Sequence, residues 1–181
     1  MSIWVCSLMR ARALVEYHKP AGVISLLDPQ ERFPDFAGYD TNTHLRVTMD
    51  DVAHDDDERR VAPSTEHIQS IIDFASNWDQ SAPLLVHCHA GVSRSSAAAF
   101  IISCALNPRS EPADIAQIIR RNSLTARPNK RMVAIGDKLL KRRGRMSVAL
   151  EAIEDSWQFH PEHDVMPYRL DANIPDKGGH L

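Results

Sequence analysis

The sequence has no long hydrophobic run and little net charge, and both absences exclude classes of protein. None of its apolar stretches approaches the about 18 residues that a membrane span needs. The apolar segment 3–8 is short and follows no basic segment, so we interpret it as a strand and not as a signal peptide. The formal net charge of −3 supplies no excess of basic groups for nucleic acid. We therefore expect neither a membrane span nor a nucleic-acid partner.

Cysteine is also scarce, and the few cysteines have no pattern. Cys6, Cys88 and Cys104 are odd in number and widely spaced, which fits neither a disulfide framework nor a zinc site. The histidines do not cluster either, because His160 and His163 lie in a Pro-rich segment without matching ligands. We therefore expect no metal site and no cofactor. Unpaired cysteines are typical of a reducing compartment, so we expect a cytoplasmic protein.

What is present is an alternation of strand and helix patterns over most of the 181 residues. The continuous apolar runs at 22–27 and 83–87 are typical of strands buried on both faces, and the alternating segment 44–49 is typical of a strand near a sheet edge. Helical patterns occupy 11–18, 95–106, the segment from Pro128, and 147–157. Two further helical segments follow Ser64 and Ser110, and we expect each serine to cap the helix that it precedes. This order predicts an α/β fold with a central, mainly parallel sheet flanked by helices.

The distribution of proline and glycine suggests where the folded part ends. The chain is long enough for one domain with a sizeable core, and helical patterning continues to about residue 157. Beyond that point the chain contains Pro161, Pro167, Pro175 and a Gly-Gly pair. We therefore predict a single catalytic domain over 1–158 and an extended C-terminal tail over 159–181.

The most informative stretch is 84–95, which begins as an apolar strand and ends as a helix start. After His87 and Cys88 come His89, Ala90, Gly91, Val92 and Ser93, and then Arg94 and Ser95. Backbone N–H groups in such a turn, together with a helix N-terminus, favour the thiolate form of Cys88 and can also bind a phosphate. Arg94 adds a planar fork that can grip two phosphate oxygens. The segment therefore combines a nucleophile, an anion cradle and a cation.

The pattern His-Cys-x5-Arg-Ser resembles the signature of the cysteine-dependent protein tyrosine phosphatases, and the order of elements from about residue 3 to 145 resembles the small dual-specificity branch. The resemblance implies a phosphomonoester hydrolase that forms a phosphocysteine on Cys88. It also implies that Arg94 binds the phosphoryl oxygens and that Ser95 helps the thiolate to leave. His87 is expected to brace the cysteine, and the backbone of 89–93 to bind substrate. A rhodanese also uses a cysteine loop before a helix, but Arg94 followed by Ser95 favours a phosphatase.

Phosphoryl transfer to a cysteine needs a proton for the departing oxygen, which a carboxylic acid can supply. In the dual-specificity branch this acid follows a strand of the form apolar-x-apolar, and residues 47–51 resemble that pattern. The register selects Asp51 as the general acid, with Asp50 as the second candidate. The acidic run 55–57 fits a solvated loop better.

Other residues could serve the same site. The segment 126–129 resembles a loop that packs beside the phosphate site in this family, and Asn129 either bonds to that site or caps its own helix. Ser93 could direct its hydroxyl to solvent or to substrate. Cys6 could resolve an oxidised Cys88, although packing is the more common role of a buried cysteine, and we expect packing for Cys104 as well.

The resemblance implies a phosphorylated protein or a small phosphomonoester as the substrate, and two alternatives stay open. One is a weak or inactive pseudophosphatase that only binds phosphoproteins. The other is a phosphoinositide phosphatase, which His89 and Val92 disfavour because they are not the basic pair expected of lipid phosphatases. The sequence does not indicate an oligomeric state.

Overall fold

Five strands and six helices make up the described part of the chain, residues 1–53, 59–154 and 165–175, in the computed structural model. In chain order they are β1 (Ser2–Ser7), α1 (Leu8–His18), β2 (Gly22–Leu27), β3 (His44–Thr48), α2 (Thr65–Ser76), β4 (Leu84–Cys88), α3 (Arg94–Leu106), α4 (Pro112–Asn122), α5 (Lys130–Leu139), α6 (Arg145–Glu154) and β5 (Tyr168–Asp171). None of these helices is long and apolar enough to cross a membrane.

The strands form one sheet in the order β3-β2-β4-β1-β5. β4 is parallel to both of its neighbours, β2 is parallel to β3, and β5 alone runs antiparallel, against β1. The predicted α/β fold with a mainly parallel sheet is therefore confirmed. β2 and β4 are buried along their whole length, and β3 lies at an edge, as their patterns predicted. Cys88 thus ends a central strand, at the edge where open α/β sheets bind ligands.

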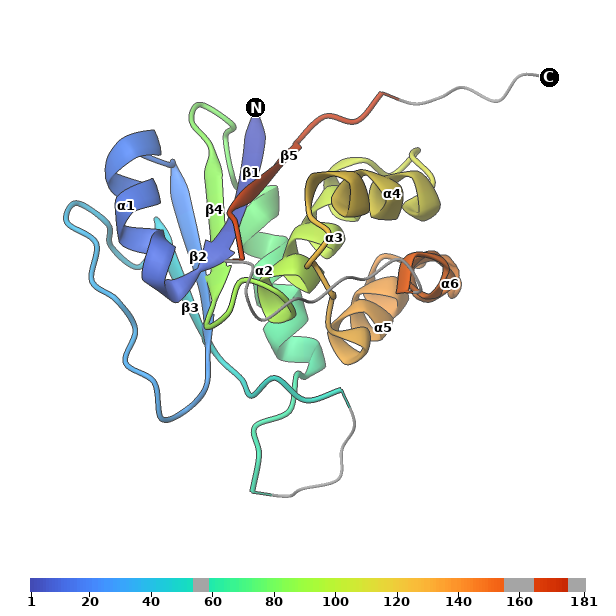
Figure 1. Ribbon diagram of the computed structural model, residues 1–181, viewed down its shortest axis with the longest axis horizontal. Coiled ribbons are helices and arrows are strands. Elements are labelled where there is room, and N and C mark those ends of the chain that lie inside the picture. The colour runs from blue at the N-terminus through green and yellow to red at the C-terminus, as the bar shows by residue number, and fades with distance from the viewer. Residues whose placement is uncertain (54–58, 155–164, 176–181) are drawn as a thin grey trace.

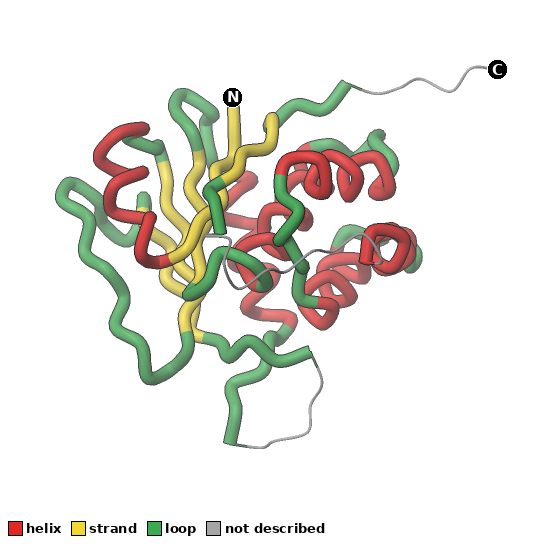
Figure 2. The backbone as a smooth tube through the Cα atoms, viewed as in Figure 1, coloured by secondary structure: helices red, strands yellow, loops and turns green. Residues whose placement is uncertain are grey.

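The sheet separates two unequal helical layers. α1 covers one face, and α2 to α6 cover the other (Figure 1; the helices are red in Figure 2). The large apolar cluster lies between the sheet and the thicker layer and contains Val86, whereas Leu85 belongs to the small cluster beneath α1. Because side chains alternate along a strand, His87 faces the α1 layer and Cys88 faces the α3 layer. The side chain of His87 therefore lies on the opposite face of the sheet from the sulfur of Cys88.

The helix starts follow local sequence signals in most places. Ser64 caps α2 as predicted, accepting a hydrogen bond from the backbone N–H of His67. The prediction that Ser110 caps the next helix was wrong. Glu111 occupies the N-cap of α4 without a side-chain cap, because Pro112 takes the first helical position, which its fixed φ suits. Ser110 instead lies near the carbonyl oxygen of Ile174.

The prediction of an extended tail over 159–181 was wrong for residues 168–171, which form β5 (Figure 1). Tyr168 and Leu170 are buried in the large cluster, while Arg169 and Asp171 are exposed. This alternation spans only four residues, too few to stand out beside a neighbouring proline. The rest of the predicted tail, 159–164 and 176–181, lies outside the described residues. Residue 158, the predicted boundary, also lies outside the described residues, and β5 pairs with β1 in the sheet of the preceding part of the chain.

Candidate active site

The turn between β4 and α3 directs its carbonyl groups outward. Three of these carbonyl oxygens accept backbone hydrogen bonds from outside the turn: His89 O from Leu8 N (3.1 Å), Val92 O from Arg127 N (3.0 Å) and Ser93 O from Asn129 N (3.3 Å). The N–H group of Gly91 points the other way and donates to the sulfur of Cys88 at 3.3 Å. The Gly91 N–H therefore faces the sulfur, and binding of an anion by the turn stays a prediction.

Gly91 is required at its position by both conformation and space. Its φ of +78° is a left-handed conformation that side chains disfavour. A Cβ there would lie 2.6 Å from the backbone nitrogen of Ser7, at the end of β1. The turn is therefore packed directly against the neighbouring strand, which fixes its shape.

The sulfur of Cys88 lies at the start of α3. The side chain is buried, and the hydroxyl oxygen of Ser95 is 3.2 Å from the sulfur. The N-terminal end of a helix favours negative charge. Cys88 and Ser95 therefore lie together in the arrangement that the predicted roles require.

Arg94 makes a buried fork with a residue that the sequence analysis missed. Its two terminal nitrogens donate to the two carboxylate oxygens of Asp28, each at 3.1 Å, and one of them also donates to the carbonyl oxygen of Met49 at 2.6 Å. Its Nε is buried without a hydrogen-bond partner among the described residues. Asp28 directly follows β2, and an acidic residue just after a mostly apolar parallel strand was the available signal, because such strands end at the ligand-binding edge.

Asp51 reaches the same turn from the end of β3. Its Oδ1 accepts hydrogen bonds from the hydroxyl of Ser93 at 2.7 Å and from the side-chain amide of Asn129 at 2.8 Å. Asp51 is solvent-exposed. The carboxylate of Asp51 is therefore held by two neutral donors at the mouth of the turn.

Asp50, the other candidate acid, has a different environment. It is buried, and its carboxylate accepts the backbone N–H of Val61 at 2.6 Å. Its own N–H donates to the carbonyl oxygen of Val61 at 2.8 Å. Asp50 thus closes the base of the loop 50–61. The acidic residues 55–57 of that loop lie outside the described residues.

Asn129 makes both of the contacts that the sequence left as alternatives. Its side-chain oxygen accepts the N–H of Met132 at 3.1 Å and so caps α5. Its side-chain amide donates to Asp51 and, at 3.2 Å, to the carbonyl oxygen of Val52. One buried side chain therefore ties α5 to the loop that carries Asp51.

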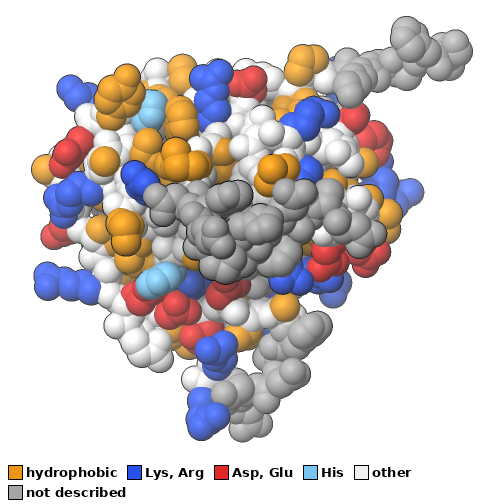
Figure 3. Space-filling view, viewed as in Figure 1, with side chains coloured by type: hydrophobic (Ala, Val, Ile, Leu, Met, Phe, Trp, Pro, Cys, Tyr) orange, Lys and Arg blue, Asp and Glu red, His pale blue; other side chains and the backbone are white. Residues whose placement is uncertain are grey.

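The rim of the turn carries a histidine paired with an acid. His89 is exposed, and its Nδ1 forms a hydrogen bond with Glu31. Burial alone would raise the pKa of Glu31, but the hydrogen bonds from His89 and from the backbone of Asp28 lower it below its ordinary value. In the space-filling view, Asp and Glu side chains gather beside a histidine in the lower part of the visible face (Figure 3). Glu31 therefore places an acidic group beside His89 at the rim of the turn.

A family comparison agrees with this geometry. The model of the protein-tyrosine phosphatase family matches residues 41–131, which include the turn, Arg94 and Asp51. The chain belongs to the protein-tyrosine phosphatase family. The phosphatase is accordingly a phosphoric monoester hydrolase. A comparison with curated proteins found no match.

Solved structures share the fold at low sequence identity. DUSP15 has a TM-score of 0.60 at 18% identity, covering 83% of the phosphatase and 90% of DUSP15. The human tyrosine phosphatase-like serine/threonine/tyrosine-interacting protein has a TM-score of 0.60 at 15% identity, covering 78% and 92% of the two chains. PTPMT1 in complex with PI(5)P has a TM-score of 0.57 at 16% identity, covering 77% and 90%. At these identities the likeness shows the fold alone.

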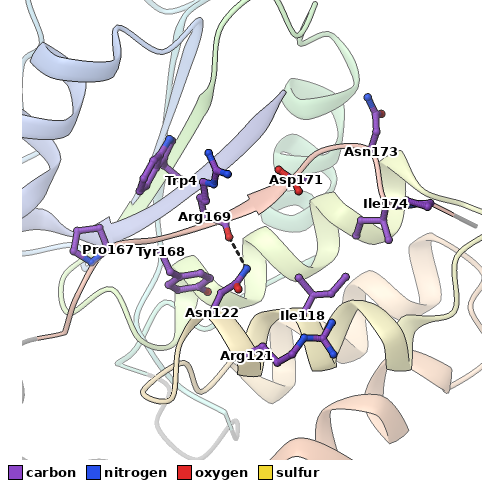
Figure 4. A pocket seen from close by; sticks show the side chains of 11 residues that line it. Trp4, Ile118, Arg121, Asn122, Pro167, Tyr168, Arg169, Asp171, Asn173 and Ile174 are labelled. Atoms are coloured by element: carbon purple, nitrogen blue, oxygen red, sulfur yellow. Dashed lines mark hydrogen bonds between the residues drawn. The ribbon is translucent and has the colours of Figure 1, made fainter.

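Two other features of the phosphatase lie apart from the turn. Cys6 pairs in register with His87, so its side chain faces the α1 layer, away from Cys88, and burial raises the pKa of the Cys6 thiol to about 12. This position suits packing and not the resolution of an oxidised Cys88. A cavity of about 660 Å³ lies between α4 and β5, bordered by Trp4 and Arg121 (Figure 4), and none of its lining residues is a predicted site residue. Among the described residues, no group of three His, Cys, Asp or Glu side chains is arranged to hold a metal ion.

Proposed function

We propose that this phosphatase hydrolyses phosphomonoesters on proteins, with tyrosine or dual specificity, through a phosphocysteine on Cys88. The observation that carries the proposal is the turn itself. Its carbonyls are engaged outside the turn, one of its N–H groups donates to the sulfur, and Ser95 and Arg94 occupy the first turn of α3. A phosphate dianion seated on such a turn lies next to the nucleophile.

In the first step the thiolate of Cys88 attacks phosphorus, and the bond from phosphorus to the substrate oxygen breaks. Asp51 donates its proton to that oxygen, which leaves as a neutral alcohol or phenol. The guanidinium of Arg94 binds the phosphoryl oxygens. Its Nε–H can donate to one of them, because it makes no hydrogen bond among the described residues.

In the second step water attacks the phosphocysteine, and the bond between phosphorus and sulfur breaks. The carboxylate of Asp51 takes a proton from the water, which restores the acid. The hydroxyl of Ser95, 3.2 Å from the sulfur, donates to the thiolate as it leaves. Since Cys88 must remain reduced, the reaction favours a reducing compartment such as the cytoplasm.

The positions of the two neighbouring aspartates support Asp51 as the acid. Asp51 contacts Ser93 in the turn and faces solvent, so a substrate oxygen can reach it. Asp50 is buried and already bonded to Val61. A general acid must lie within hydrogen-bond reach of the atom it protonates.

The rim of the turn favours a phosphoprotein over a phosphoinositide. A headgroup with additional phosphates needs basic side chains beside the turn. Instead, Val92 is apolar and His89 is paired with Glu31. PTPMT1 shares the fold and its structure holds PI(5)P, so the test must also include phosphoinositide substrates.

The test is hydrolysis of p-nitrophenyl phosphate by the wild type and Cys88→Ser, each with and without a metal chelator. We expect turnover by the wild type in both conditions and none by Cys88→Ser, because a serine hydroxyl stays protonated where a thiolate forms. Turnover by Cys88→Ser, or a need for added metal, would refute the proposal. Tight phosphopeptide binding without wild-type turnover would identify a pseudophosphatase.

Substrate profiling follows with phosphotyrosine, phosphoserine and phosphothreonine peptides and with phosphoinositides. We expect the peptides to have the higher kcat/KM. A higher kcat/KM for phosphoinositides would leave the phosphocysteine mechanism in place and overturn the substrate class.

A further inference from the structure

Three polar side chains form a buried row behind the phosphate loop. The hydroxyl oxygen of Ser25 on β2 lies 2.6 Å from Nε2 of His87 on β4 and 2.7 Å from Nε2 of His44 on β3. All three residues are almost fully buried, with His44 the most exposed at 3%. The mechanism above uses none of these side chains, although His87 directly precedes the nucleophile.

The strand register explains how the row forms. Ser25 pairs with His87, and His44 pairs with Val23, two residues before Ser25. Residues paired in this way in parallel strands project from the same face of the sheet, here the α1 face. Phe36 packs against both imidazoles, with ring centroids 5.1 Å from His44 and 6.3 Å from His87. The row is thus a polar strip under an apolar cover.

The number of protons on the three side chains allows only two arrangements of donors and acceptors in the row. Burial lowers the pKa of His44 and of His87 to about 4, so near neutral pH each ring carries one proton. A hydroxyl has a single proton, so Ser25 can donate to only one of the two Nε2 atoms and must accept from the other. One imidazole is therefore protonated on Nε2 and the other on Nδ1.

Chain position connects the row to the nucleophile. His87 directly precedes Cys88 on β4, and its Nδ1 is buried without a hydrogen-bond partner among the described residues. The ring of His87 is therefore held at Nε2 by Ser25, which His44 holds in turn.

We propose that Ser25 and His44 are positioning residues of this phosphatase, which hold the ring of His87 directly behind Cys88. Through His87 they fix the backbone conformation of the nucleophile, and with it the alignment of its sulfur with the turn N–H groups. The proposal rests on the proposed role of Cys88 as the nucleophile and adds two residues that act through a third.

Other charged or titratable groups act on the same atoms and must remain in place during a test. Ser95 on α3 contacts the sulfur of Cys88, and Cys6 on β1 and Tyr168 on β5 interact with Cys88 electrostatically. The charges of Arg46 and Asp35 act on His44. Because the substitutions below leave all of these groups intact, a change in the reactivity of Cys88 reports on the row.

The first test measures the pH midpoint of Cys88 alkylation by iodoacetate, which requires no turnover. Ser25→Ala and His44→Leu break the row, and we expect each to raise the midpoint by about half a pH unit, as loss of an aligned hydrogen bond would. His44→Gln keeps an N–H donor at the Nε2 position and should restore the wild-type midpoint. Phe36→Leu loosens the same cover without removing a hydrogen bond, so it should lower the melting temperature and leave the midpoint unchanged.

The second measurement uses the wild-type protein and so does not depend on whether the variants fold. Nitrogen chemical shifts of the His44 and His87 rings distinguish a proton on Nδ1 from one on Nε2. Opposite tautomers in the two rings support the proposal, and the same tautomer in both rings overturns it. An unchanged alkylation midpoint in both folded row-breaking variants also overturns it. If the wild type lacks turnover but the midpoint shifts, the row stands and the proposed function fails.

Discussion

Asp28 and Asp51 occupy equivalent places in the fold but have different partners. Each follows a parallel strand, β2 or β3, and each reaches the turn at Cys88. Asp28 makes a two-bond fork with the buried guanidinium of Arg94, whereas Asp51 accepts from the neutral donors Ser93 and Asn129. A carboxylate in a bidentate pair orients its cation. An exposed carboxylate at the mouth of the turn lies where a substrate oxygen can reach it.

The comparison shows that the sheet edge gathers the acidic groups and that the contacts of each group decide its role. Asp50 also differs from Asp51 in its contacts, because it is the adjacent residue in the chain but accepts a hydrogen bond from Val61. A one-residue step along the chain thus separates an aspartate that closes a loop from one that contacts the turn at Ser93. Substitution of the three aspartates can test this separation.

The largest effect is expected from Asp51→Asn. Removal of a general acid typically costs about 10² to 10⁴ in rate, and more when the leaving group is poor. We therefore expect kcat for a phosphotyrosine peptide to fall further than kcat for an activated aryl phosphate, and the alkaline limb of the pH–rate profile to flatten. The matched control is Asp50→Asn, which should lower the melting temperature without this leaving-group dependence. The reverse result would exchange the two roles.

Asp28→Asn should have a smaller effect of a different kind. Loss of the ion pair leaves Arg94 less well oriented, so we expect kcat/KM to fall by about tenfold. The factor should be the same for both leaving groups, because Asp28 donates no proton to them. Steady-state kinetics with the same two substrates measures it. If Asp28→Asn shows the leaving-group dependence expected of Asp51→Asn, the division between the two carboxylates is wrong.

Acid should lower stability through the histidine row, which lies apart from both carboxylates. Burial lowers the pKa of His44 and His87 from 6.5 to about 4, so the unfolded chain binds more protons between these values. The unfolding free energy should therefore fall as the pH drops from about 6.5 toward about 4. Urea denaturation across this range measures the slope. His44→Leu should have a smaller slope, and an unchanged slope would contradict the assignment.

The smallest effect is expected from Tyr168→Phe. The Tyr168 hydroxyl on β5 donates to Ser96 on α3 at 2.9 Å, and burial raises the pKa of Tyr168 well above its usual value. Removing a hydroxyl from a buried pair costs about 1 kcal/mol of stability. Activity should change by less than about threefold, since neither carboxylate is touched. A loss of activity comparable with that of Asp28→Asn would give β5 a role in the site.

The parts of the site that the sequence predicted are those encoded in short segments. Cys88, Gly91, Arg94 and Ser95 lie within eight consecutive residues, so one strand, one turn and one helix start place them together. The pairing of Arg94 with Asp28 spans 66 residues, and the pairing of His87 with Ser25 spans 62. Such contacts depend on strand order and register, which an apolar pattern does not specify.

The fold divides in a similar way. The buried strands and the long helix α3 have strong patterns, and they were predicted close to their observed limits. β5 has only four residues and is held in place by distant groups, such as Asn107, which donates to the carbonyl oxygen of Ala172 and accepts from the N–H of Ile174. A short strand defined by its partners leaves little signal in its own residues.

The most direct test of the central claim is detection of a phosphocysteine. Wild-type protein is mixed rapidly with a radiolabelled aryl phosphate, quenched in acid and digested. We expect the label on the peptide that contains Cys88, and a larger labelled fraction in Ser95→Ala, in which departure of the thiolate is slowed. Turnover without label on that peptide, or label retained in Cys88→Ser, would contradict the account.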